Sequence, residues 1–89
     1  MKTRKGYTLR SLGNEYILVA ESLDAVDFTR MISMNDSAAF LWKELEGKDF
    51  DVEMMTHLLM EEYGISREVA EQDVPVLLQS WKEANLIED

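Results

Sequence analysis

The stretch MISMNDSAAFLWKEL, Met31 to Leu45, joins a short apolar run directly to an amphipathic helix and decides the fold. Asn35 is a natural N-cap, and Asp36 places a negative charge in the first helical turn, where backbone N–H groups lack partners. Beyond the cap, apolar residues at i, i+3, i+4 and i+7 form one helical face: Ala38, Leu41, Trp42 and Leu45. We therefore expect a small sheet to meet a set of packed helices at this junction.

The residues before the junction predict an antiparallel hairpin. Residues 6–12 alternate apolar and polar side chains, and EYILVA at 15–20 is rich in β-forming residues. Gly13 and Asn14 between them tolerate the positive φ angle that a tight turn requires. Met31–Met34 then forms a short third strand at the edge of the sheet, where a row of backbone N–H and C=O groups is unpaired.

A second helix is predicted from Asp51, its N-cap, to about Tyr63. Gly64 can take the left-handed conformation that ends a helix, and Ile65 can fold back onto the helix end. The residues expected to face the core are Val52, Met55, Leu58, Leu59 and Tyr63.

Ser66 caps a third predicted helix, which Asn85 can end in the left-handed conformation before Leu86–Ile87 pack back. Pro75 conflicts with a continuous helix, because it removes one backbone hydrogen bond and clashes with an earlier carbonyl, at about 3 kcal/mol. The sequence leaves open a kink or break near Asp73 and a separate last helix that starts at Pro75. The expected inward residues are Ala70, Val74, Leu77, Leu78 and Trp81.

A length of 89 residues fits one domain, 1–89, with strands within about 6–34 and helices within about 36–85. Apolar residues make up 46% and charged residues 30% of the chain, as in folded globular domains. The lack of cysteine removes thiolate nucleophiles and thiolate metal sites, and it suits a reducing compartment. No apolar run is long enough for a signal peptide or a membrane span, so we expect a cytoplasmic protein without membrane contact.

Charge is unevenly distributed along this chain, whose net charge is −9. Four of the nine basic residues lie in the first ten positions, whereas Met31–Asp89 carries 14 acidic and four basic residues. This acidic part repels a phosphate backbone, which argues against nucleic-acid binding. A solvated acidic surface explains the pattern without a partner; the sharper hypothesis is a helical surface that attracts a basic or amphipathic partner.

The usual catalytic and metal-binding patterns are missing from the sequence. His57 is the only histidine and lies off the apolar face of the second helix, so we expect it at the surface. The acid pairs Glu44/Glu46 and Glu61/Glu62 lack the spacing of a calcium loop, and no glycine-rich phosphate loop occurs. We expect no enzyme, no metal site and no cofactor. Core filling explains most of the six methionines. We expect Trp42 and Trp81 in the core or in a groove wall, not as stacking platforms for bases.

The residues ISMNDSAAFLW at 32–42 closely resemble the strand-to-helix signature of PqqD-like proteins, named for coenzyme PQQ synthesis protein D. The resemblance covers nearly the whole chain. It includes the strand EYILVA at 15–20, the brief extended segment AVDF at 25–28, the end of the second helix at 63–65, and EANLI at 83–87.

The resemblance implies an α+β, winged-helix-like domain with a three-stranded antiparallel sheet followed by three helices, known as a precursor-peptide recognition element. Such domains bind the leader segment of a ribosomally made peptide and present it to a modifying enzyme, often a radical SAM enzyme, and they do not catalyse. The leader adds as a strand to the third strand and lies in a groove against the last helix. The corresponding residues here are Met31, Ile32, Ser33 and Met34 on the strand and Val69, Asp73, Val76, Ser80 and Glu83 on the helix.

Within this implied groove, Val76 would make an apolar contact, and Asp73 and Glu83 could pair with Lys or Arg of the leader. The sequence departs from the family pattern at Pro75, inside the helix that should line the groove, and at Asn85, where glycine is usual.

Two alternatives remain open. A PqqD-like domain can be a structural or regulatory interaction subunit with no leader peptide, for example a homodimer, because fold alone does not establish function. A winged-helix DNA binder also fits the architecture. It conflicts with the acidic charge, since the third helix carries only Arg67 and Lys82 as basic residues.

Overall fold

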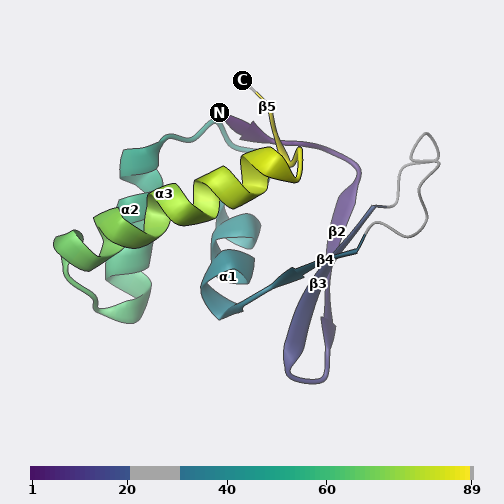
Figure 1. The fold of residues 1–89 in the computed structure, drawn as a ribbon, viewed down its shortest axis with the longest axis horizontal. Helices are drawn as coiled ribbons and strands as arrows, with labels where there is room; N and C mark the ends of the chain where they lie inside the picture. Colours follow the sequence, from purple (N-terminus) through teal and green to yellow (C-terminus); the bar gives the residue numbers. More distant parts are fainter. Residues whose placement is uncertain (21–30, 89) are drawn as a thin grey trace.

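The structure is a computed structural model that describes residues 1–20 and 31–88. It confirms the expected α+β architecture: a three-stranded antiparallel sheet precedes three helices (Figure 1). The sheet consists of β2 (Tyr7–Leu12), β3 (Glu15–Ala20) and β4 (Met31–Met34), and the helices are α1 (Asp36–Leu45), α2 (Val52–Tyr63) and α3 (Arg67–Glu83). The extended segment expected at Ala25–Phe28 lies outside the described residues.

The predicted hairpin between β2 and β3 is confirmed. Leu12 pairs with Glu15 across the turn, where Gly13 has a φ of 64°. The strand order β2-β3-β4 places β4 at one edge of the sheet, as expected. Ile32 and Met34 of β4 turn toward the core, whereas Met31 and Ser33 are exposed. One face of the sheet therefore packs against the helices.

The predicted junction between strand and helix is also confirmed. The Asn35 side chain accepts a hydrogen bond from the backbone N–H of Ala38 at 2.9 Å, so α1 begins directly after β4. All four residues of the expected apolar face are buried: Ala38, Leu41, Trp42 and Leu45. Trp42 is 0% exposed and packs edge to face against the rings of Tyr7 and Trp81. The buried face of α1 therefore lies at the centre of the core.

The ends of α2 are formed as predicted, but its buried face differs. Asp51 caps the helix, and Gly64 ends it in the left-handed conformation. Val52 and Tyr63, expected in the core, are each 43% exposed. Thr56 is buried instead, because its hydroxyl donates a 2.8 Å hydrogen bond to the Val52 carbonyl and needs no water.

The predicted break in the third helix is wrong. α3 runs without interruption from Arg67 to Glu83, with Pro75 inside it, so no separate last helix begins at Pro75. Pro75 and Glu71 are both exposed, and water can therefore satisfy the carbonyl that the proline leaves without a partner. Asn85 has a φ of 61° after the helix, and Leu86 returns to the core, as expected.

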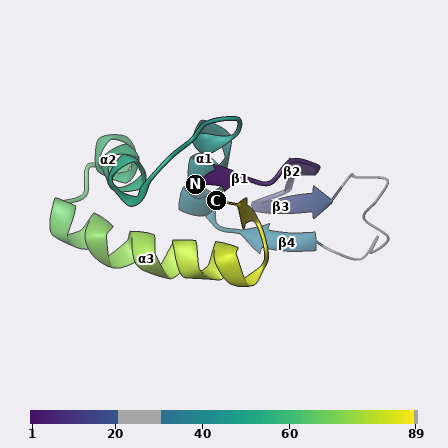
Figure 2. The same ribbon diagram turned by 90° about the horizontal axis from the view of Figure 1, so that it is seen from above.

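A second, two-stranded sheet was not predicted. β1 (Lys2–Thr3) pairs antiparallel with β5 (Ile87–Glu88), and both views show the two ends of the chain side by side (Figures 1 and 2). The Phe50 N–H donates to the Met1 carbonyl at 2.7 Å, and the Phe50 side chain is buried. These contacts fix the segment that follows α3, where Leu86 and Ile87 lie.

Within residues 1–20 and 31–88, no helix combines the length and the apolar character needed to cross a membrane.

Candidate functional site

The outer edge of β4 offers backbone hydrogen-bonding groups. A two-residue turn makes its flanking residues, Leu12 and Glu15, a hydrogen-bonded pair, and such pairs alternate along an antiparallel ladder. On β3, the backbone groups of Tyr16 and Leu18 therefore point toward β4, where they face Met34 and Ile32.

Met31 and Ser33 consequently direct their N–H and C=O groups away from β3. No described strand pairs with this side of β4, since it ends the sheet. Within the described part of the chain, β4 is thus an edge at which a further strand can add.

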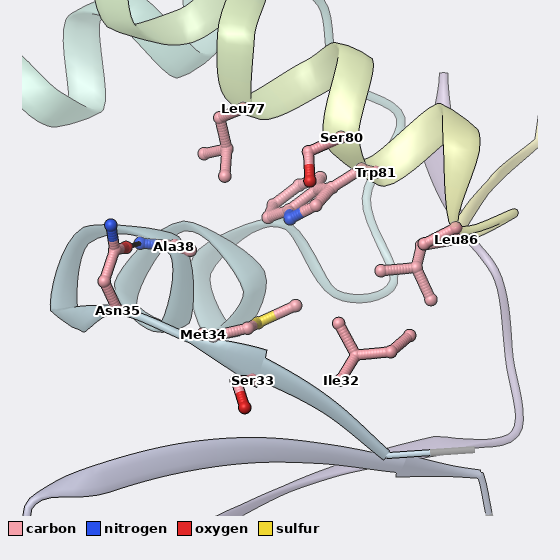
Figure 3. Close-up of a pocket in the computed structure, with 10 residues that line it drawn as sticks. Ile32, Ser33, Met34, Asn35, Ala38, Leu77, Ser80, Trp81 and Leu86 are labelled. Atoms are coloured by element: carbon pink, nitrogen blue, oxygen red, sulfur yellow. Dashed lines mark hydrogen bonds between the residues drawn. The ribbon is translucent and has the colours of Figure 1, made fainter.

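A pocket of about 170 Å³ lies between β4 and α3 (Figure 3). Ile32 and Met34 point into it from β4, and Leu77 and Trp81 close it from α3, with Leu86 at one end. The Ser33 side chain points away from it. An apolar cavity of about 150 Å³ can hold a benzene ring. This β4–α3 pocket therefore has room for one apolar side chain of a strand added to β4.

Two further cavities extend this space along α3. One, of about 400 Å³, lies between the start of α1 and α3 and is lined by Asn35, Ser37, Leu59, Asp73, Val76, Leu77 and Ser80. The other, of about 480 Å³, lies along the outer side of the helix and is lined by Pro75, Val76, Gln79, Ser80 and Glu83. All three cavities share Ser80. We call the three neighbouring cavities together the groove.

Most of the predicted site residues meet at this groove. Ile32, Ser33, Met34 and Ser80 line the β4–α3 pocket, and Asp73, Val76 and Glu83 line the other two cavities. Val76 is 71% exposed and lines two of the cavities. Met31 and Val69 line none of the three cavities, although both are exposed, Met31 on the free edge and Val69 nearer the start of α3.

The sequence-based prediction missed several groove residues. Leu77 was expected only in the core, and Asn35 only as a helix cap, but each also lines the groove. Trp81, expected in the core or in a groove wall, is buried and lines the groove as well. Helical periodicity separates the inward face from the outward face, and it cannot separate the core from a groove wall. The return of Leu86 after α3 was predicted, yet its place at the end of the pocket depends on the unpredicted β1–β5 pair.

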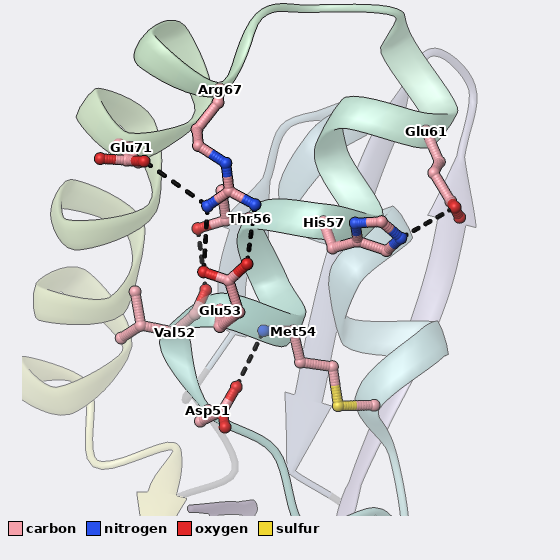
Figure 4. Close-up of polar contacts among 9 residues, drawn as sticks. All are labelled: Asp51, Val52, Glu53, Met54, Thr56, His57, Glu61, Arg67 and Glu71. Carbon is pink, nitrogen blue, oxygen red and sulfur yellow. Dashed lines mark hydrogen bonds and ion pairs between the residues drawn. The ribbon is translucent and has the colours of Figure 1, made fainter.

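The ion pairs of Glu53 and His57 on α2 involve residues that line none of the three cavities (Figure 4). Arg67 donates to both carboxylate oxygens of Glu53, at 2.7 and 3.0 Å, and also lies 3.5 Å from Glu71. The hydrogen bonds from Arg67 lower the pKa of Glu53, and those to Glu53 raise the pKa of Arg67. His57 is exposed, as predicted, and contacts Glu61 at 3.0 Å. Of these contacts, the Arg67–Glu53 pair connects α2 to the start of α3.

The described part of the chain contains no group of three or more His, Cys, Asp or Glu side chains that could hold a metal ion.

Comparison with known families settles the relationship. Residues 15–87 match the model of the family of coenzyme PQQ synthesis protein D, PqqD. The chain belongs to the PqqD family. None of the curated proteins matches this PqqD-family chain.

Two solved structures share the fold of this PqqD-family protein. One is TbiB1 in complex with the TbiA(beta) leader peptide, with a TM-score of 0.72, 20% identity, and coverage of 99% of this chain and 95% of the other. The second is lasso peptide synthetase B1 complexed with the leader peptide, with a TM-score of 0.71, 20% identity, and coverage of 99% and 96%. At this identity the likeness concerns the fold.

Proposed function

We propose that this protein is a peptide-binding adaptor. It binds the leader segment of a ribosomally made precursor peptide, which adds as a strand to β4, and it presents the peptide to a modifying enzyme. The observation that carries the proposal is the edge of β4 beside the groove, with which no described strand pairs, since backbone pairing and a side-chain pocket are available at the same place. Strand addition supplies affinity through the backbone, and the pocket supplies selectivity.

The relatives support this proposal. The chain belongs to the PqqD family over residues 15–87, and both structures that share its fold were solved with a leader peptide. The predicted contacts on β4 are Met31, Ile32, Ser33 and Met34. On α3 they are Val69, Asp73, Val76, Ser80 and Glu83. Of these nine, seven line the groove, which agrees with the proposed peptide path.

The modifying enzyme is the second proposed partner, and a radical SAM enzyme is the class that the family suggests. An adaptor acts by raising the local concentration of the peptide at the enzyme, and it needs no catalytic group of its own. We therefore assign the chemistry to the partner.

The proposed ligand can be found by isolating the tagged protein from its source lysate and identifying bound peptides and proteins by mass spectrometry. A small genetically encoded peptide recovered with an enzyme supports the adaptor role. Larger proteins alone, or none, would favour an interaction subunit without a leader, for which a homodimer is the form to test.

Once a peptide is identified, substitutions at Ser33 test strand addition. Ser33→Pro removes an N–H that points to the free edge, whereas Ser33→Ala keeps it and serves as the matched control. We expect Ser33→Pro to weaken peptide binding at least about tenfold, because it removes a hydrogen bond and obstructs the approaching strand. Ser33→Ala should bind like the original protein. Undiminished affinity in a folded Ser33→Pro variant would count against strand addition.

A further inference from the structure

The ionisable side chains that line the groove are acidic. Among the described residues that line its three cavities, the two ionisable side chains are Asp73 and Glu83, and both are acidic. Both are exposed on α3, and neither forms an ion pair with another residue in the described part of the chain. Glu83 accepts one hydrogen bond, from Gln79 at 3.2 Å. A peptide in the groove therefore passes two carboxylates.

We propose that the groove selects leaders in which two basic residues lie four positions apart, with an apolar residue midway between them. This inference rests on the proposed function, since it assumes a peptide strand on β4. It names the class of leader that this chain accepts, from the placement of its own acidic and apolar side chains.

The spacing follows from the geometry of the helix and the added strand. Asp73 and Glu83 are about 15 Å apart along α3, since an α-helix rises about 1.5 Å per residue. β4 and α3 run in opposite directions in both views, and β4 lies near the C-terminal end of α3 (Figures 1 and 2). A strand paired with β4 therefore also runs along α3.

In that strand, alternate side chains face the groove, and positions i and i+4 are separated by roughly 13 Å. The flexible stems of Lys or Arg can span the remaining distance to the two carboxylates. The side chain at position i+2 then falls between the two basic residues.

The middle position meets the apolar part of the groove. Leu77 and Ser80, which lie between Asp73 and Glu83 along α3, both line the β4–α3 pocket. Across from them, Ile32 and Met34 turn their side chains into the same pocket (Figure 3). An apolar side chain of the leader therefore faces the pocket when its neighbours two positions away face the carboxylates.

The general charge of the protein does not by itself give this pattern. A net charge of −9 attracts any basic peptide and repels any acidic one, regardless of where its charges lie. A substitution at Glu71 separates the effect of the net charge from the effect of charges located in the groove. Glu71 lies nine residues from Ser80, half a turn around the helix, and lines none of the three cavities. Removing its charge changes the net charge equally without altering the groove.

The test uses two displayed libraries of 14-residue peptides that share random β-prone and apolar positions. One fixes Lys at two positions four apart around a fixed Leu, and the other fixes Glu at the same two positions. Each is selected against the whole protein and against the variants Asp73→Asn, Glu83→Gln and Glu71→Gln. We expect enrichment from the Lys library only.

For the selected peptides, Asp73→Asn and Glu83→Gln should each weaken binding roughly two- to fivefold at low salt, the range of an exposed ion pair. Glu71→Gln should change affinity less than either, and added salt should reduce the difference between them. Moving the two Lys residues to positions three apart should also weaken binding, because one then faces away from the groove.

Three results would overturn the inference. If the Glu library is enriched equally, or if all three variants weaken binding equally, the groove does not read local charge. The adaptor role then still stands, provided that Ser33→Pro abolishes the binding. If neither library yields a peptide that depends on Ser33, strand addition fails, and the charge pattern fails with it.

Discussion

Replacing Trp42 by alanine should remove a large share of the stability of this fold. The side chain is 0% exposed, it packs edge to face against Tyr7 and Trp81 at 6.3 and 5.4 Å, and its Nε1 donates to Glu46 at 3.2 Å. Burying about 200 Å² of aromatic surface at about 25 cal/mol per Å² stabilises the fold by about 5 kcal/mol. Alanine keeps less than about 1 kcal/mol of this.

The expected loss is therefore about 4 kcal/mol, within the range of about 3–5 kcal/mol typical of buried aromatic residues. A chain of 89 residues has a total stability of roughly 4–13 kcal/mol, so the variant should be barely folded or unfolded. Urea unfolding followed by far-ultraviolet circular dichroism measures the loss without depending on tryptophan fluorescence. Trp42→Phe is the matched control, since it keeps a ring, and it should cost roughly 1–2 kcal/mol.

A Trp42→Ala protein within about 1 kcal/mol of the original in free energy of unfolding would refute this reasoning. If that stable variant had also lost peptide binding, Trp42 would belong to the groove and not to the core.

The remaining predictions concern the helices. Pro75→Ala should stabilise the protein by roughly 1–2 kcal/mol. Alanine gains about 3 kcal/mol in the helix, and this exceeds the loss of about 1 kcal/mol that comes from a more flexible unfolded chain. Urea unfolding measures the difference, and a less stable variant would contradict the prediction. Glu53 has a pKa lowered by Arg67, so its contribution to stability is present above its ordinary pKa of 4.5 and is lost as the pH falls through the lowered value. Glu53→Gln should therefore flatten the acid side of the stability profile below about pH 5, and an unchanged slope there would argue against the pair.

Local sequence signals predicted the helices and the hairpin well. Asn35, Asp51 and Ser66 accept hydrogen bonds from the first turn of their helices. Gly64 and Asn85 take the left-handed conformation, which glycine and asparagine tolerate better than most residues. The strands β1 and β5 have two residues each, too few for any alternation to be visible in the sequence. Tertiary contacts alone create them.

The sequence predicted the outer side of the groove but did not distinguish its inner walls from the core. Asp73, Val76, Ser80 and Glu83 follow one exposed row of α3, which sequence spacing can find. The inner walls, Leu77 and Trp81, have the same periodicity as core residues, and only the position of β4 makes them groove walls. At Pro75 the sequence-based prediction was wrong. Local propensity predicted a break in the helix, but packing of the buried face of α3 keeps the helix continuous.

Hydrogen exchange at the backbone of β4 tests strand addition most directly. In the free protein, the amides of Ile32 and Met34 should exchange slowly because they face β3, and the amide of Ser33 should exchange fast because it faces the free edge. On addition of the cognate leader, the Ser33 amide should become protected, whereas the exchange of the Ile32 and Met34 amides should change little. A Ser33 amide that is already protected without peptide, or that stays fast in the saturated complex, would contradict strand addition to β4.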